Sequence, residues 1–544
     1  MEATSVAGLL LLAVLVSGYL ARLLHLPLPL VQMALGALID SLGLTTGVLD
    51  PALFFLLFLP PLLFIDGWRI PQDALRRDAG TILTLALGLV LATVLGMGWF
   101  IHWLIPSMPL AVAFALAGVI APTDPIAVSA VTARHPVPAR LMHLLQGEAL
   151  LNDASGLVCM RFAATAALTG AFSLTGALLS FAWVAASGLL IGAAVTWGVA
   201  RIAAHATGHG TQGGGSQILA TLLLPFGVYL LAERLHCSGI LAAVAAGLTM
   251  NLTDAWPWRA ATRLQRTAVW DTVQLVTNGS IFVLLGQQLP ALLRATPPTV
   301  LVTGHTDPWW LAGAAGLIVL ALGALRFAWV GLSFWLGAVA ARRRGEDTPM
   351  HGWRVVLVAS LAGVRGAVTL AGVLTLPLTL PDGGPFPARD LAILLAAGVI
   401  VLSLAVATLL LPPVLRGLHW PAEPLHGSVE HATRRAAAEA AMQALEQARR
   451  QRKSAAEPNP HLDPRYDDAE ARLLAMYRQR IAQNTATDPA RRLEDQAIER
   501  ELGLLGLRAE RAEARRYGRL HGLDELALRR IVRELDFQEA RHGV

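Results

Sequence analysis

The amino-acid sequence predicts an all-α polytopic membrane protein that ends in a polar helical tail. Of its 544 residues, 55% are hydrophobic and 15% are charged, whereas soluble domains are roughly 45–50% apolar even when glycine is counted. The apolar residues gather in runs of about 20, the length that crosses ~30 Å of hydrocarbon as a helix. Charged residues become dense only after about residue 421. We therefore expect a transmembrane domain over residues 1–420 and a helical tail over residues 421–544.

Thirteen apolar runs are candidates for transmembrane helices. They cover approximately residues 5–24, 28–46, 50–67, 79–104, 109–132, 141–168, 176–204, 217–234, 238–252, 270–290, 309–340, 352–376 and 389–416. The eighth and ninth runs are short and nearly continuous, so the boundary between them is the least distinct of the boundaries between runs.

The arginines between these runs predict how the protein is oriented. Loops on the side of the C-terminus carry fifteen arginines and loops on the other side carry three. Because cytoplasmic loops are enriched in Arg and Lys, we expect a cytoplasmic tail and an outside N-terminus, in the inner (cytoplasmic) membrane. The fifteen are Arg22, Arg69, Arg76, Arg77, Arg134, Arg140, Arg201, Arg259, Arg263, Arg266, Arg342, Arg343, Arg344, Arg354 and Arg416; the three are Arg234, Arg294 and Arg389.

The fifth run contains a Thr-Asp pair between two prolines, in the segment Ala121–Pro125. Pro122 and Pro125 remove two backbone donors and disfavour helix at the residue before each ring. Irregular backbone at membrane depth persists where it faces protein or a wet cavity, and half-helix ends that meet near the midplane form ion sites in secondary transporters. We expect a broken helix here, with a simple proline kink as the alternative. Thr123 and Asp124 then lie at the break.

Glu148, Asn152 and Asp153 place two carboxylates and a carboxamide inside the sixth run. One Asp at the centre of a transmembrane helix costs about 2.5–3.5 kcal/mol, so such residues usually contact an ion, a proton or a partner charge. At 100° per residue, Glu148 and Asn152 share one helix face, and Asp153 is turned about 140° from Glu148. One carboxylate is therefore expected to face a transport pathway and the other a structural partner. Asn152 and Thr123 either complete an oxygen shell for a cation or bridge the broken helix.

Two arginines at membrane depth require counter-charges. Arg365 lies in the twelfth run between Gly363 and Gly366, and Glu148 and Asp124 are its candidate partners. Arg326 lies in the middle of the eleventh run, and the sequence does not identify its partner.

Asp66 at the end of the third run has two interpretations. It either reaches the pathway from the cytoplasmic end or pairs with Arg69, three residues later.

The positions of the expected breaks also indicate a repeat. The broken-helix candidates lie in the fifth and twelfth runs, seven apart, so runs 1–6 and 8–13 predict two inverted six-helix repeats with the seventh run as a linker.

Composition and motifs exclude several classes of protein. The net charge of +5 follows from loop arginines and does not indicate nucleic-acid binding. The two cysteines, Cys159 and Cys237, imply no disulfide framework, and the tail has neither a phosphate-binding loop nor a metal-ligand cluster, so we expect no cofactor. A cation channel would require a filter sequence, and an intramembrane aspartyl protease would require Tyr-Asp and Gly-x-Gly-Asp motifs; the runs contain neither.

Four segments resemble the sodium/proton exchangers of the monovalent cation:proton antiporter family 1. They are Ala121–Pro125, Gly147–Asp153, Gly363–Gly366 and Tyr229–Ile240, in the order of that family and over essentially all of residues 5–416. The resemblance implies a thirteen-helix fold with a core domain and a dimerisation domain, and a homodimer in the lipid bilayer.

The resemblance also implies roles for individual residues. Asp153 would carry the transported ion or proton, with Thr123, Asn152 and Asp124 at the same site, so that Asp153 and Thr123 hold Na⁺. Glu148 and Arg365 would form a structural ion pair. Asp66 and Arg326 remain possible site residues on the sequence argument above. Two departures stand out: Ala149 occupies a position where many relatives have Ser, and the acidic residue of the third run, Asp66, is displaced by one.

Together these observations predict a secondary active transporter rather than an enzyme. We expect electroneutral exchange of a monovalent cation, Na⁺ in the first place, for H⁺, with a role in pH and sodium homeostasis. A K⁺/H⁺ antiporter of the same fold is the alternative. The tail is expected to be either regulatory or in contact with the second protomer.

Overall fold

The computed structural model describes the chain in sixteen stretches. They are residues 2–44, 51–132, 137–170, 174–207, 214–252, 260–302, 307, 309–343, 352–416, 424–455, 463–485, 489–520, 528, 531–532, 535–536 and 538–539. Within them the regular structure is helical, apart from an isolated bridge between Thr379 and Pro385. The all-α prediction is confirmed. The chain divides into two compact units, Met1–His419 and Trp420–Val544.

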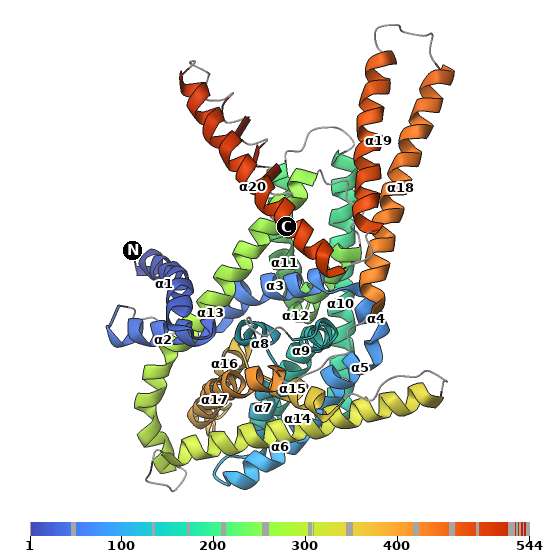
Figure 1. The fold of residues 1–544 in the computed structure, drawn as a ribbon. Coiled ribbons are helices and arrows are strands. Elements are labelled where there is room, and N and C mark those ends of the chain that lie inside the picture. Colours follow the sequence, from blue (N-terminus) through green and yellow to red (C-terminus); the bar gives the residue numbers. More distant parts are fainter. Residues whose placement is uncertain are drawn as a thin grey trace. The chain divides into compact units, whose positions relative to one another are not determined.

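The first unit contains seventeen α-helices and one π-helical segment among its described residues (Figure 1). They are α1 (Glu2–Leu24), α2 (Leu28–Ser41), α3 (Pro51–Arg69), α4 (Gln72–Arg77), α5 (Ala79–Leu83), the π-helical η1 (Thr84–Leu89), α6 (Val90–Leu104), α7 (Leu110–Ile120), α8 (Pro125–Val131), α9 (Ala139–Thr169), α10 (Leu174–Thr207), α11 (Gly214–Arg234), α12 (Gly239–Leu252), α13 (Ala260–Val302), α14 (Trp309–Arg343), α15 (Trp353–Leu361), α16 (Ala367–Leu374) and α17 (Arg389–Arg416).

Seven stretches of helix in the described part are long and apolar enough to cross a membrane. They are Val6–Leu24, Ala79–Leu104, Ala182–Ala203, Gly215–Arg234, Thr262–Ala291, Trp309–Val339 and Arg389–Arg416, and α2, α7 and α12 are shorter apolar helices. The other predicted runs do not form helices that are both long and apolar enough to be counted here. Two of them are interrupted, and α9 carries Glu148, Asp153 and Arg161 within its length.

The expected break in the fifth run is confirmed, and the twelfth run is broken as well. Helix α7 ends at Ile120 and α8 begins at Pro125, while α15 ends at Leu361 and α16 begins at Ala367. The two interruptions meet, because the Asp124 N–H donates to the Val364 carbonyl at 2.8 Å. Backbone groups that the breaks release from helix bonding are thus paired with each other, as burial requires.

Helix α13 is longer than its apolar run. It extends from Ala260 to Val302, so Arg263 and Arg266 lie within a helix and not in a loop as predicted. Arg266 is 5% exposed, and its guanidinium lies 4.6 Å from the ring centre of Trp68 on α3. This cation–π contact gives a charged residue of the N-terminal extension a packing partner within the helix. The loop arginines Arg134, Arg259 and Arg344 lie outside the described residues.

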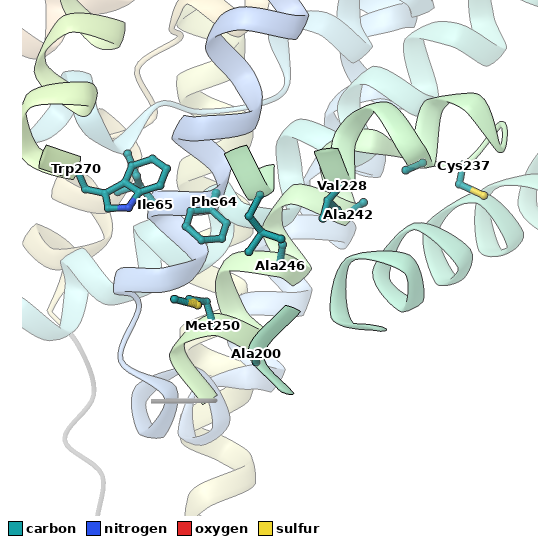
Figure 2. Close-up of a cluster of buried hydrophobic side chains, with 11 residues drawn as sticks. Phe64, Ile65, Ala200, Val228, Cys237, Ala242, Ala246, Met250 and Trp270 are labelled. Atoms are coloured by element: carbon teal, nitrogen blue, oxygen red, sulfur yellow. The ribbon is translucent and has the colours of Figure 1, made fainter. Parts of the chain in front are cut away.

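A buried apolar cluster fixes α3 against its neighbours (Figure 2). Phe64 and Ile65 of α3 pack with Trp270 of α13, and the Phe64 and Trp270 rings stack at a centroid distance of 5.2 Å. The remaining members come from α10, α11 and α12 and from the turn between the last two: Ala200, Leu224, Val228, Ala232, Cys237, Ala242, Ala246 and Met250. This cluster places the next residue of α3, Asp66, at a defined position.

The second unit is helical where it is described. It contains α18 (Pro424–Ala455), α19 (Asp463–Thr485) and α20 (Pro489–Leu520), and α18 and α19 lie side by side (Figure 1). Arg449 of α18 lies within 4.0 Å of Asp467 and Glu470 of α19. Within residues 421–544, where the sequence predicts a helical tail, the described residues form these three helices. Pro464 stands at the start of α19, where proline is tolerated in a helix.

Candidate functional site: a carboxylate-lined cavity at two broken helices

A cavity of about 60 Å³ lies beside the two broken helices. Its polar lining brings together Asp66 of α3, Thr123 and Asp124 of the first break, Asp153 of α9 and Asn278 of α13. The other lining residues are Leu59, Leu62, Leu63, Pro122, Pro125, Ala149, Ile281, Phe282, Gly366, Val368 and Thr369. Residues from five distant parts of the chain therefore meet at one small space.

The two carboxylates of α9 lie in different surroundings. Asp153 lines the cavity, whereas Glu148 is 1% exposed and lies outside the lining. This separation follows from helix phase, which turns the two residues about 140° apart. The structure agrees with the expectation that the pair does not converge on one ion.

Thr123 connects Glu148 and Asn152 across the break. Its hydroxyl donates to Glu148 Oε1 at 3.3 Å and accepts a hydrogen bond from Asn152 Nδ2 at 3.1 Å. Asn152 is 1% exposed and does not line the cavity, and among the described residues its Oδ1 has no hydrogen-bond partner. Of the two alternatives for Asn152, the structure shows the bridge to the broken helix, and it leaves one buried oxygen available.

Glu148 is paired with Arg326 and not with Arg365. Arg326 of α14 donates to Glu148 Oε1 at 2.5 Å and to Oε2 at 2.8 Å, and its Nε donates to the Ala359 carbonyl at 3.0 Å. The side chains are 3% and 2% exposed. This is a bidentate buried pair, the geometry in which an arginine binds a carboxylate most strongly. The predicted Glu148–Arg365 contact was wrong.

Arg365 lies within the second break, and its guanidinium binds backbone carbonyls. Its Nε donates to the Ile120 carbonyl at 2.8 Å, its Nη1 donates to the Gly363 carbonyl, and its N–H donates to Ser403 Oγ at 3.2 Å. Ile120 is the last residue of α7, so the guanidinium neutralises the negative end of that half-helix. Arg365 therefore binds the released carbonyls of both breaks.

Asp124 lies at the opposite, positive ends of the half-helices. Its Oδ1 accepts a hydrogen bond from the Ala127 N–H at 3.3 Å in the first turn of α8. Gly366, which precedes α16, is so close that a Cβ atom there would lie 2.7 Å from Cβ and Cγ of Asp124. Helix N-termini stabilise negative charge, so this carboxylate is held beside the N-termini of α8 and α16.

Asp66 and Arg69 do not pair. Asp66 lines the cavity, while Arg69 forms an ion pair with Asp271 and donates from Nη1 to Gln274 Oε1 at 2.6 Å, both on α13. The structure therefore does not show the predicted alternative of an Asp66–Arg69 pair, and it places Asp66 at the cavity.

The sequence reasoning missed two features of this site. Asn278 of α13 lines the cavity, and only its polar side chain inside the apolar run 270–290 could have indicated it. Arg326 was recognised as needing a partner, but sequence offers no means to choose between carboxylates on other helices.

The lining is suited to a small hard cation. Carboxylate, hydroxyl and carboxamide oxygens are the ligands that such ions prefer. The cavity volume of about 60 Å³ exceeds the roughly 10–15 Å³ needed to hold one water, so it leaves room for a partly hydrated ion. Among the described residues, no cluster of three or more His, Cys, Asp or Glu is arranged to hold a resident metal ion.

Two proteins of similar sequence carry the names of cation/proton exchangers. Over 541 residues the chain is 38% identical to an uncharacterised Na⁺/H⁺ exchanger of Escherichia coli, with 97% of each chain covered. It is 42% identical over 413 residues to a sodium, potassium, lithium and rubidium/H⁺ antiporter of Bacillus pumilus, covering 75% of this chain and 60% of that protein.

The fold also has a solved counterpart. The sodium proton antiporter MjNhaP1 of Methanocaldococcus jannaschii matches 77% of this chain and 99% of its own, with a TM-score of 0.56 and 19% identity. Residues 10–417 match the family described as sodium/hydrogen exchanger, transmembrane. On this evidence, the chain belongs to the transmembrane sodium/hydrogen exchanger family.

Proposed function

We propose that this protein is a secondary active transporter, and not an enzyme, that exchanges Na⁺ for H⁺ across the inner membrane. The observation that carries the proposal is the cavity, where Asp153, Asp124 and Thr123 meet at the crossing of two broken helices. Family membership supports the exchange of these ions. Its expected role is in pH and sodium homeostasis.

In the proposed mechanism, Asp153 binds either a proton or a cation. Each occupant neutralises the carboxylate, and only the occupied form crosses, so one Na⁺ moves for each H⁺ and no net charge moves. Asp124 and the Thr123 hydroxyl are the further oxygen ligands, and Asn152 orients Thr123 by donating a hydrogen bond to its hydroxyl. Glu148 takes no part in this exchange, because Arg326 occupies both of its oxygens.

The architecture proposed for the transporter has thirteen transmembrane helices in two inverted six-helix repeats, with α10 between them. The two breaks, at α7/α8 and α15/α16, support it, because they lie in the fifth and twelfth runs. The excess of arginines in alternate loops supports an outside N-terminus and a cytoplasmic C-terminus. We further propose a homodimer, and a tail that regulates transport or contacts the second protomer.

A K⁺/H⁺ exchanger is the second candidate. The Bacillus pumilus relative is named for sodium, potassium, lithium and rubidium, and Ala149 lines the cavity where a hydroxyl would favour a smaller ion. A wider and less polar site discriminates less strongly between Na⁺ and K⁺.

The test is transport by the purified protein in proteoliposomes that carry an imposed pH gradient. Addition of Na⁺ should collapse the gradient in the absence of a membrane potential, and the initial rates with Na⁺, Li⁺ and K⁺ give the selectivity. Uphill cation movement driven by the proton gradient distinguishes an antiporter from a channel. No collapse with any monovalent cation would refute the proposed function.

A further inference from the structure

Arg69 is drawn away from the cavity by two side chains of α13. It forms an ion pair with Asp271 and donates to Gln274 Oε1 at 2.6 Å. Asp271 and Gln274 are three residues apart, so both face α3 from the same side of α13. The rings of Phe64 and Trp270 stack with a centroid distance of 5.2 Å and pack α3 against α13 (Figure 2). Trp270 directly precedes Asp271 in the chain.

Without these acceptors, Arg69 would have another anion within reach. Asp66 is three residues earlier on α3, so the two side chains lie on one helix face. Asp66 lines the cavity and, in the described structure, has no ion pair with Arg69. A guanidinium that turned to Asp66 would place a fixed positive charge at the wall of a cation site, and the cation would then have to compete with it.

We infer that Asp271 is a positioning residue, which together with Gln274 holds Arg69 away from Asp66 and so keeps the cytoplasmic wall of the cavity negative for the incoming cation. This rests on the proposed function. Asp271 touches neither the ion nor the reacting carboxylate, and its role is exerted through Arg69.

A second arginine near α3, Arg266, already contacts an aromatic ring. Arg266 of α13 is 5% exposed and lies over the Trp68 ring at 4.6 Å. Arg69 and its partner are more accessible to solvent, with side chains that are 36% exposed for Arg69 and 58% exposed for Asp271. An exposed pair of this kind adds little to the stability of the fold, so replacing Asp271 should change where Arg69 points while leaving the protein folded.

The experiment compares variants of the full chain in two assays. Exchange is measured in proteoliposomes as the half-saturating Na⁺ concentration at fixed pH, and Na⁺ binding is measured as the Na⁺-dependent rise of melting temperature in detergent. The variants are Asp271→Ala, Asp271→Asn and the double variant Arg69→Ala/Asp271→Ala. The matched control is Asp40→Ala, which removes an ion pair of α2 with Arg294 elsewhere on α13.

We expect Asp271→Ala to raise the half-saturating Na⁺ concentration roughly two- to fivefold, the range that an exposed ion pair controls. Asp271→Asn should have a smaller effect, because its carboxamide still accepts from Arg69. The double variant should return to the wild-type value, since it removes the competing cation. In an Asp66→Asn background, Asp271→Ala should have no further effect.

Three results would overturn the inference. An unchanged value for Asp271→Ala would show that Arg69 does not compete at the cavity. A double variant as impaired as Asp271→Ala alone, or an equal loss in Asp40→Ala, would show a general weakening of helix packing. If the wild type binds Na⁺ but exchanges nothing, the proposed function fails, and the binding assay still decides the role of Asp271.

Discussion

Arg326 holds both carboxylate oxygens of Glu148, at 2.5 and 2.8 Å, in a place where neither side chain is more than 3% exposed. The pair joins α9, which carries Asp153, to α14. Thr123 donates to the same carboxylate at 3.3 Å, so the pair also anchors the first break. Glu148 thus fixes three segments around the cavity without lining it.

Removal of either partner should destabilise the protein. Arg326→Ala or Glu148→Ala leaves an uncompensated buried charge, which costs about 3–5 kcal/mol. The double variant Glu148→Ala/Arg326→Ala leaves no charge and should melt at a higher temperature than either single variant. Fluorescence-detected thermal unfolding in detergent measures this; a double variant less stable than both singles would contradict it.

Asp153→Asn should abolish exchange and leave the fold intact. The carboxamide has the shape of the carboxyl group but cannot take up a proton or balance the charge of Na⁺. The measurement is pH-gradient-driven ²²Na⁺ uptake, with Asp382→Asn, an exposed loop carboxylate outside the cavity, as the control. Uptake by Asp153→Asn at the wild-type rate would contradict the assignment of Asp153 as the residue that binds the ion or the proton.

Gly366→Ala should eliminate transport by crowding Asp124. The added Cβ would lie 2.7 Å from Cβ and Cγ of Asp124, a separation that forces the two breaks apart. Gly323→Ala on α14 is the matched control, because nothing lies within 4 Å of a Cβ there, and alanine favours helix by about 1 kcal/mol. The expected result is loss of initial exchange rate in the first variant and none in the second; equal rates would show that the breaks can adjust.

Arg365→Ala should destabilise the crossing of the broken helices. The carbonyls of Ile120 and Gly363 would lose their donor, and a buried unsatisfied group costs about 1–3 kcal/mol. Arg365→Lys should recover only part of the loss, because an ammonium is a point charge without the planar fork of donors. Thermal unfolding ranks the three proteins, and a lysine variant as stable as the wild type would mean that charge alone is required.

The sequence by itself determined the class of the protein and the position of its breaks. Apolar runs of spanning length, Pro122 and Pro125 around Thr123-Asp124, and the phase of Glu148 against Asp153 are local properties, and they depend on helix geometry and on missing backbone donors. For the same reason the all-α class and the first break could be predicted and are confirmed. Helix phase also separated the two carboxylates of α9 before any contact was known.

The tertiary structure alone decided which distant charges meet. Arg326 and Arg365 are both buried arginines; the sequence indicated Glu148 or Asp124 as the partner of Arg365 and identified none for Arg326. The pairing depends on which helix lies opposite, and Gly363 leaves the space that Arg326 fills, since a Cβ there would lie 2.7 Å from its Cδ. In the same way, packing of α3 on α13 turned Arg69 toward Asp271 and left Asp66 to the cavity. Pairings across helices depend on a packing arrangement that no local pattern encodes.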